Sequence, residues 1–87
     1  MRASTFNLIT LLCNKGFELL EESFGEAGYG SATLINPFKV VGIVVTKDST
    51  YVDVEDRKTG VVTPVIKDRQ RVSSNDYRKI LSAIYLN

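Results

Sequence analysis

The sequence predicts an α+β fold of one domain over residues 1–87: an N-terminal helix, an antiparallel β-meander of three to four strands, and a C-terminal helix. Apolar residues recur at helical spacing near both ends of the chain. Between them lie runs rich in β-branched residues, separated by short turns. Because three strands alone cannot bury a face, both helices are expected to pack on one side of the sheet.

The first helix is expected over residues 5–15. The hydroxyl of Ser4 or Thr5 can cap its first turn. Its apolar face, at helical spacing, is made of Leu8, Ile9, Leu12 and Cys13. The cysteine is therefore expected to pack in the core.

Residues 17–24 are compatible with two structures. Asn14, Lys15 and Gly16 are typical of a helix C-terminus, which would make residues 17–24 a separate first strand. Alternatively, one helix continues to Ser23, because the Glu-Leu-Leu-Glu-Glu run has high helix propensity and an interior glycine costs only about 1 kcal/mol. Propensity slightly favours the continuous or kinked helix.

The strands are expected from residue 31 onward. A glycine-containing loop precedes a short extended segment, residues 31–36, which ends before Pro37. Residues 40–46 are β-branched on both faces, as expected for a central strand that is covered on both sides or packed at an interface. Residues 51–55 alternate between apolar and polar side chains. Tight turns at 47–50 and 56–60 lead to a last strand, residues 61–66, which Pro64 places at an edge or a bulge.

The last helix has the clearest local signal. Ser73 and Asp76 form a variant of the capping box, and Val72 can pack against Tyr77. The apolar residues that follow at helical spacing are Tyr77, Ile80, Leu81 and Ile84.

The residues that are missing limit the chemistry. The chain has no histidine and one cysteine, which removes His-based acid–base catalysis, Ser-His and Cys-His nucleophile pairs, an internal disulfide and cysteine-rich zinc sites. Asp53, Glu55 and Asp56 are the densest carboxylate group, but two basic residues follow directly, and a solvated sheet face is expected. We therefore predict a protein that is not an enzyme and that uses no metal and no cofactor.

Aromatic residues favour a binding function, because tyrosine is enriched at interface hot spots. The candidate protein-binding residues are Tyr29 in the glycine loop, Tyr51 on the polar sheet face and Phe38 after Pro37. The leading hypothesis is an inhibitor or accessory protein, of the kind often encoded by phages or mobile elements, that covers a surface of a protein partner. A homodimer through the strand Val40–Val45 is compatible with it.

Charge is nearly balanced overall but unevenly placed. Residues 1–38 carry two basic and four acidic side chains, a sum of −2, whereas residues 39–87 carry nine and six, a sum of +3. Lysine and arginine side chains supply sequence-independent affinity for nucleic acids. The alternative function is therefore a nucleic-acid-binding module. Its basic loop and helix face are Lys67, Arg69, Arg71, Arg78 and Lys79.

The order of helix, strands and helix is shared by double-stranded-RNA-binding domains and by small HicA-like toxin ribonucleases. The chain resembles the latter at Asn14–Phe17, after the first helix, and at Thr63–Val65, which leads through a basic loop to the last helix. That family relies on a strand histidine, and this chain has none. The resemblance therefore supports the topology and no nuclease activity.

The sequence also suggests a compartment. The longest apolar stretch, Val40–Val45, is far short of the roughly 20 residues that a membrane-spanning helix needs. Polar residues interrupt the apolar run within residues 1–13, which therefore does not match a signal peptide. With a single thiol, a cytoplasmic protein is expected.

Overall fold

The computed structural model describes residues 1–85, apart from the side chains of residues 68 and 69. In chain order, five strands follow an N-terminal helix and precede a C-terminal helix. The elements are α1 (Ala3–Asn14), β1 (Glu18–Phe24), β2 (Gly30–Ile35), β3 (Lys39–Val45), β4 (Thr50–Asp56), β5 (Val62–Arg69) and α2 (Ser74–Tyr85).

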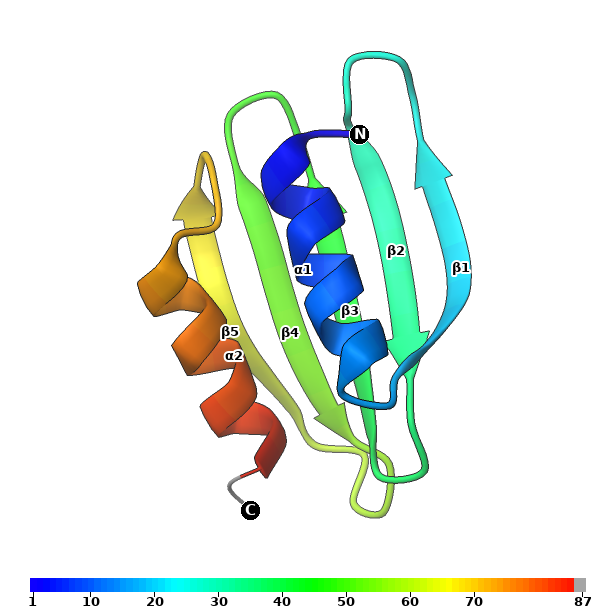
Figure 1. Cartoon of the computed structure of the whole chain (residues 1–87). Coiled ribbons are helices and arrows are strands. Elements are labelled where there is room, and N and C mark those ends of the chain that lie inside the picture. Colours follow the sequence, from blue (N-terminus) through cyan, green and yellow to red (C-terminus); the bar gives the residue numbers. More distant parts are fainter. Residues whose placement is uncertain (86–87) are drawn as a thin grey trace.

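The five strands form one antiparallel sheet in which each strand pairs with the next along the chain, in the order β1-β2-β3-β4-β5. Both helices lie on the same face of this sheet: α1 crosses its middle, and α2 packs over β4 and β5 (Figure 1). The predicted α+β fold is confirmed. The sheet has five strands rather than three to four, because residues 17–24 and 31–36 both contribute one.

The end of α1 decides the structure of residues 17–24. Gly16 has a left-handed φ of +94°, which a side chain rarely tolerates. The Phe17 N–H donates to the Leu12 carbonyl at 3.0 Å and the Gly16 N–H to the Cys13 carbonyl at 3.1 Å, the two bonds of a Schellman motif. Phe17 and Leu12 are both buried in the core. The preference for a continuous helix was therefore wrong, because these contacts outweigh the helix propensity of the glutamate-rich run.

The two helix N-termini differ. Helix α1 begins at Ala3 with Arg2 in the N-cap position and no side-chain cap, so the predicted cap at Ser4 or Thr5 is wrong. In α2 the predicted capping box is present: the Ser73 Oγ accepts the Asp76 N–H at 3.2 Å, and the Asp76 carboxylate accepts the Ser73 N–H at 2.9 Å.

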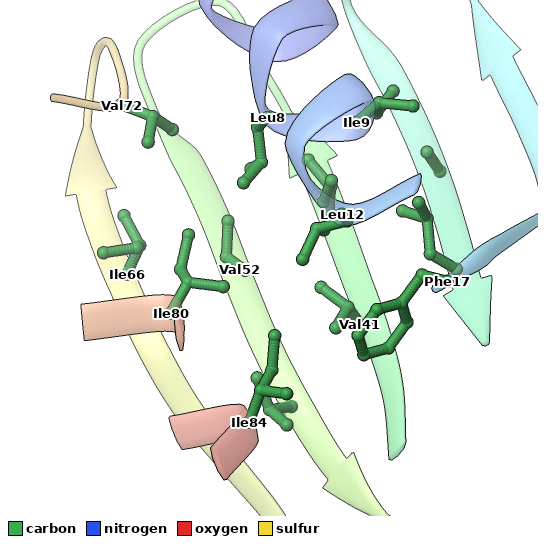
Figure 2. Close-up of a cluster of buried hydrophobic side chains, with 14 of the residues drawn as sticks. Leu8, Ile9, Leu12, Phe17, Val41, Val52, Ile66, Val72, Ile80 and Ile84 are labelled. Carbon is green, nitrogen blue, oxygen red and sulfur yellow. The ribbon is translucent and has the colours of Figure 1, made fainter. Parts of the chain in front are cut away.

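The core fills the space between the helices and the sheet (Figure 2). Leu8 and Leu12 of α1 and Ile80 of α2 are fully buried against it. The side chains that β2 to β5 contribute from the same face are Ala32, Leu34, Val41, Ile43, Val45, Val52, Val54 and Ile66. Cys13 is exposed, contrary to prediction, because the buried stripe of α1 runs through Leu8, Ile9 and Leu12 and leaves the next residue outside.

The turns and the last strand follow the predictions. The Gly60 N–H donates to the Asp56 carbonyl at 2.7 Å, and Gly60 has the expected left-handed φ of +75°. Strand β5 lies at the edge of the sheet, and its register with β4 shifts next to Pro64, so this proline is at both an edge and a bulge.

Candidate interaction surfaces

The structure does not bring the three predicted protein-binding residues together. Tyr29 lies in the loop before β2 and Phe38 in the loop after it, so the length of β2, about 20 Å at 3.3 Å per residue, separates them. Tyr51 lies on β4. All three side chains are exposed, and the Arg2 guanidinium lies 5.4 Å from the centre of the Tyr29 ring, within cation–π range.

The predicted basic cluster is divided between two sides of the molecule. Lys67, Arg71, Arg78 and Lys79 are exposed, and the Arg69 side chain is outside the described part of the chain. Lys67 follows the buried Ile66 and therefore points to the side of the sheet away from the helices. Arg78 and Lys79 lie on α2, which covers the other side. Within the described residues, these cations do not form a single continuous face.

No described helix covers the face of the sheet opposite α1 and α2 (Figure 1). Strand register identifies its members, because directly paired residues share a face and neighbours alternate. Ile35 pairs with Val40, Val40 with Glu55, and Glu55 with Val62; in another row, Ser31 pairs with Val44 and Val44 with Tyr51. We call this surface the open face. Its larger apolar members are Ile35, Val40, Val44, Tyr51 and Val62.

Acidic side chains surround this apolar centre. Glu18 and Glu21 come from β1, where they pair with Ile35 and Thr33. Asp53 and Glu55 come from β4 and share the face, as predicted. Against these four carboxylates stands Lys67 on β5, so the described charges of the open face sum to −3.

The middle of the open face is shallow because it contains Gly42. A Cβ atom added there would lie 2.7 Å from the Asp53 Oδ1, so the carboxylate occupies the position that a side chain would take. Asp56, the third carboxylate of the predicted group, belongs to a different site. Within residues 1–85, no group of three His, Cys, Asp or Glu side chains with described positions could hold a metal ion.

At the end of the sheet near the C-terminus of α2, the β2–β3 and β4–β5 loops form a hollow of about 500 Å³. Phe38, Arg57, Lys58 and Tyr85 line its wall together with the ion pair between Lys39 and Asp56. Of the residues in this hollow, the sequence indicated Phe38 as a binding residue and Asp56 as a member of the carboxylate group, but it did not place them together. No local pattern shows that these residues meet, because the tertiary fold brings two hairpins and a helix end together.

The ion pair between Lys39 and Asp56 is partly buried. Lys39 is 6% exposed, and its Nζ lies 3.0 Å from the Asp56 Oδ2. The Lys39 hydrogen bond, assisted by the backbone N–H groups of Lys58 and Thr59, lowers the pKa of Asp56 from its ordinary value of 3.8. The carboxylate is therefore charged at neutral pH, and it compensates the charge of the buried ammonium.

Comparisons with protein-family models, with curated proteins and with solved structures found no match to this chain. The resemblance to HicA-like ribonucleases therefore rests on the order of the elements and on short motifs. No described helix is long and apolar enough to cross a membrane.

Proposed function

We propose that this chain is a small non-catalytic binding protein, of the inhibitor or accessory type, that covers a surface of another protein with its open face. One observation carries the proposal: a five-stranded sheet with both helices on one side leaves an apolar centre uncovered on the other. Exposed contiguous apolar surface of this kind is typical of interaction sites. A cytoplasmic location and a phage or mobile-element origin belong to the same proposal.

The dimensions of the open face suit a protein interface. Strands are spaced about 4.8 Å apart and rise about 3.3 Å per residue, so five strands of six to eight residues span roughly 24 Å by 20 Å or more. With side-chain relief, that footprint is on the scale of the roughly 800 Å² that each partner buries in a standard interface.

The charges favour one kind of partner. Four carboxylates and one ammonium surround the apolar centre, and complementary potentials speed association and select partners. We therefore propose a partner surface with an apolar centre and a basic rim. A nucleic acid is disfavoured on this face, because phosphates would meet carboxylates.

A second copy of the chain is a less suitable occupant. Both edges of β3 are hydrogen-bonded to neighbouring strands, so the strand Val40–Val45 can meet another molecule only through its open side. Two open faces packed together would oppose two surfaces of net charge −3. Light scattering over a concentration series tests this point. If the wild type is a dimer and Val44→Lys converts it to a monomer, the proposal of a different protein as partner is overturned.

Two neighbouring valines provide a matched test of the proposed surface. Val62 is 50% exposed and faces the open side, whereas Val61 is 60% exposed and lines a small hollow with Ala83 of α2 on the helix side. In quantitative pull-downs from the native host, proteins retained by the wild type should be retained by Val61→Lys and lost with Val62→Lys. Equal retention by both variants, or turnover of a substrate by the purified protein, would contradict the proposal.

The alternative function, nucleic-acid binding through residues 67–79, is supported by the exposure of four basic side chains but not by their division between two sides. A salt titration with duplex DNA tests it. Binding that weakens steeply with salt and that falls with Arg71→Ala would favour it, and no binding at about 50 mM salt would remove it.

A further inference from the structure

Two large aromatic side chains are exposed at the hollow between the β2–β3 and β4–β5 loops. Phe38 is 72% exposed and Tyr85 is 62% exposed. Both line the same hollow of about 500 Å³, which is within the usual size range of small-ligand sites.

The Phe38 loop is held in place rather than loose. The Asn36 Oδ1 accepts the N–H groups of Phe38 at 2.8 Å and Lys39 at 2.6 Å. From the other hairpin, Arg57 donates its backbone N–H to the Phe38 carbonyl at 3.0 Å and its Nη1 to the Asn36 carbonyl at 2.8 Å. Phe38 is therefore exposed on a preorganised backbone, which reduces the entropic cost of binding a ligand to it.

The hollow also has an uncompensated positive charge. Asp56 is matched by Lys39, since the two form the ion pair described above. Arg57 and Lys58 remain, and neither forms an ion pair with a carboxylate of the described residues. The lining therefore has a net charge of +2, opposite in sign to the open face.

We propose that this hollow binds a nucleoside phosphate, either as a free mononucleotide or as one unit of a single-stranded nucleic acid. A base stacks on the ring of Phe38, the more exposed of the two aromatic side chains, and Arg57 and Lys58 contact the phosphate. Aromatic platforms beside cationic side chains are the usual means of holding single strands without sequence preference. An acidic peptide would use the same cations but would gain little from two flat exposed rings. This inference is independent of the proposed protein-binding face.

Fluorescence anisotropy of the full chain with a short labelled oligothymidylate tests the site, with thymidine monophosphate as a competitor. Phe38→Ala should weaken binding roughly 5- to 150-fold, which corresponds to the loss of one base stack. Phe6→Ala is the matched control, because Phe6 is also highly exposed but lies in α1, away from the hollow. It should leave the affinity unchanged.

A second pair of variants tests the cations. Lys58→Ala should reduce the salt slope of log affinity by about 0.7, the value for one phosphate contact on a single strand. Lys47→Ala removes an exposed lysine from the β3–β4 turn at the opposite end of the sheet and should leave the slope unchanged. Competition by the mononucleotide would identify the free ligand as sufficient, and its failure would assign the site to a strand.

Three results would overturn the inference: no binding of the oligonucleotide at about 50 mM salt, equal losses with Phe38→Ala and Phe6→Ala, or equally tight binding of an oligoglutamate peptide of the same charge. The urea midpoint of each variant confirms that it is folded. Val62→Lys, which changes the proposed protein-binding face, should leave oligonucleotide binding intact, so the failure of one proposal is distinguishable from the failure of the other.

Discussion

The two faces of strand β3 have similar residues and different environments. Val41, Ile43 and Val45 point to the helices and are buried, whereas Val40 and Val44 point away, Val40 half-buried and Val44 45% exposed. The sequence alternation alone does not distinguish these two sets, because both are β-branched and apolar. What separates them is the position of the helices, which cover one face only. The comparison teaches that apolar character on both sides of a strand can combine a core with a surface available for binding.

If this interpretation is correct, equivalent substitutions should have unequal effects on the two faces. Changes on the helix side should lower the free energy of unfolding. Changes on the open side should alter binding and leave stability nearly unchanged.

Core truncation should have the largest effect. Leu12 is fully buried and packs at the end of α1, so Leu12→Ala should lower the free energy of unfolding by about 2–5 kcal/mol. Val44→Ala, on the open face, should change it by less than about 1 kcal/mol. Urea denaturation followed by circular dichroism measures both. Similar losses for the two variants would indicate that the open face is covered in the protein as it exists in solution.

Two glycines extend the comparison to the backbone. Gly30 has a φ of +152°, and a Cβ atom there would collide with the Ser23 carbonyl of the paired strand β1, so Gly30→Ala should cost about 2–3 kcal/mol. At Gly42 the added Cβ would meet only the movable Asp53 carboxylate. Gly42→Ala should therefore change stability by no more than about 1 kcal/mol. The two urea midpoints test this, and a large loss at Gly42 would show that Asp53 is held rigidly.

The elements of the fold with strong local signals were predictable. The capping box of α2 and the alternation of β4 each depend on residues close in sequence, and both are present in the structure. Residues 17–24 were ambiguous, because a Schellman motif at Gly16 and a glutamate-rich helical run make opposite local predictions. Burial of Phe17 against the core resolved the conflict, and burial is a tertiary property that no local pattern contains.

The surfaces were less predictable than the fold. Tyr29, Phe38 and Tyr51 were correctly expected to be exposed, but their separation follows from strand lengths and pairing that the sequence did not reveal. The acidic rim of the open face combines residues of β1 and β4, which are not neighbours in the sheet. Only the register of the intervening strands shows that these carboxylates share one side.

The packing of α2 on the sheet should depend on the capping box at the N-terminus of this helix. Ser73→Ala removes the hydroxyl that accepts the Asp76 N–H and donates to the Asp76 carboxylate at 3.0 Å. Loss of an N-cap side chain costs typically about 1 kcal/mol. Hydrogen exchange should then increase in α2 and in β5 beneath it, more than in β2. Uniform exchange throughout the domain would show that α2 unfolds only together with the whole sheet.

The smallest effect on stability is expected at the ion pair of Lys39 and Asp56, which lies at the end of the sheet near the C-terminus of α2. Asp56→Asn keeps an oxygen that can accept the N–H groups of Lys58 and Thr59, but it removes the charge and replaces the oxygen that accepts the Lys39 ammonium with an NH2 group. Because the pKa of Asp56 is lowered in the folded protein, the carboxylate contributes stability above its ordinary pKa of 3.8, and this contribution is lost as the pH falls through the lower folded value. Urea midpoints of the wild type and the variant should therefore differ at pH 7 and converge in acid. A difference that persists at the lowest pH would assign the effect to the lost acceptor for the Lys39 ammonium rather than to the carboxylate charge, and no difference at pH 7 would show that solvent already screens the pair.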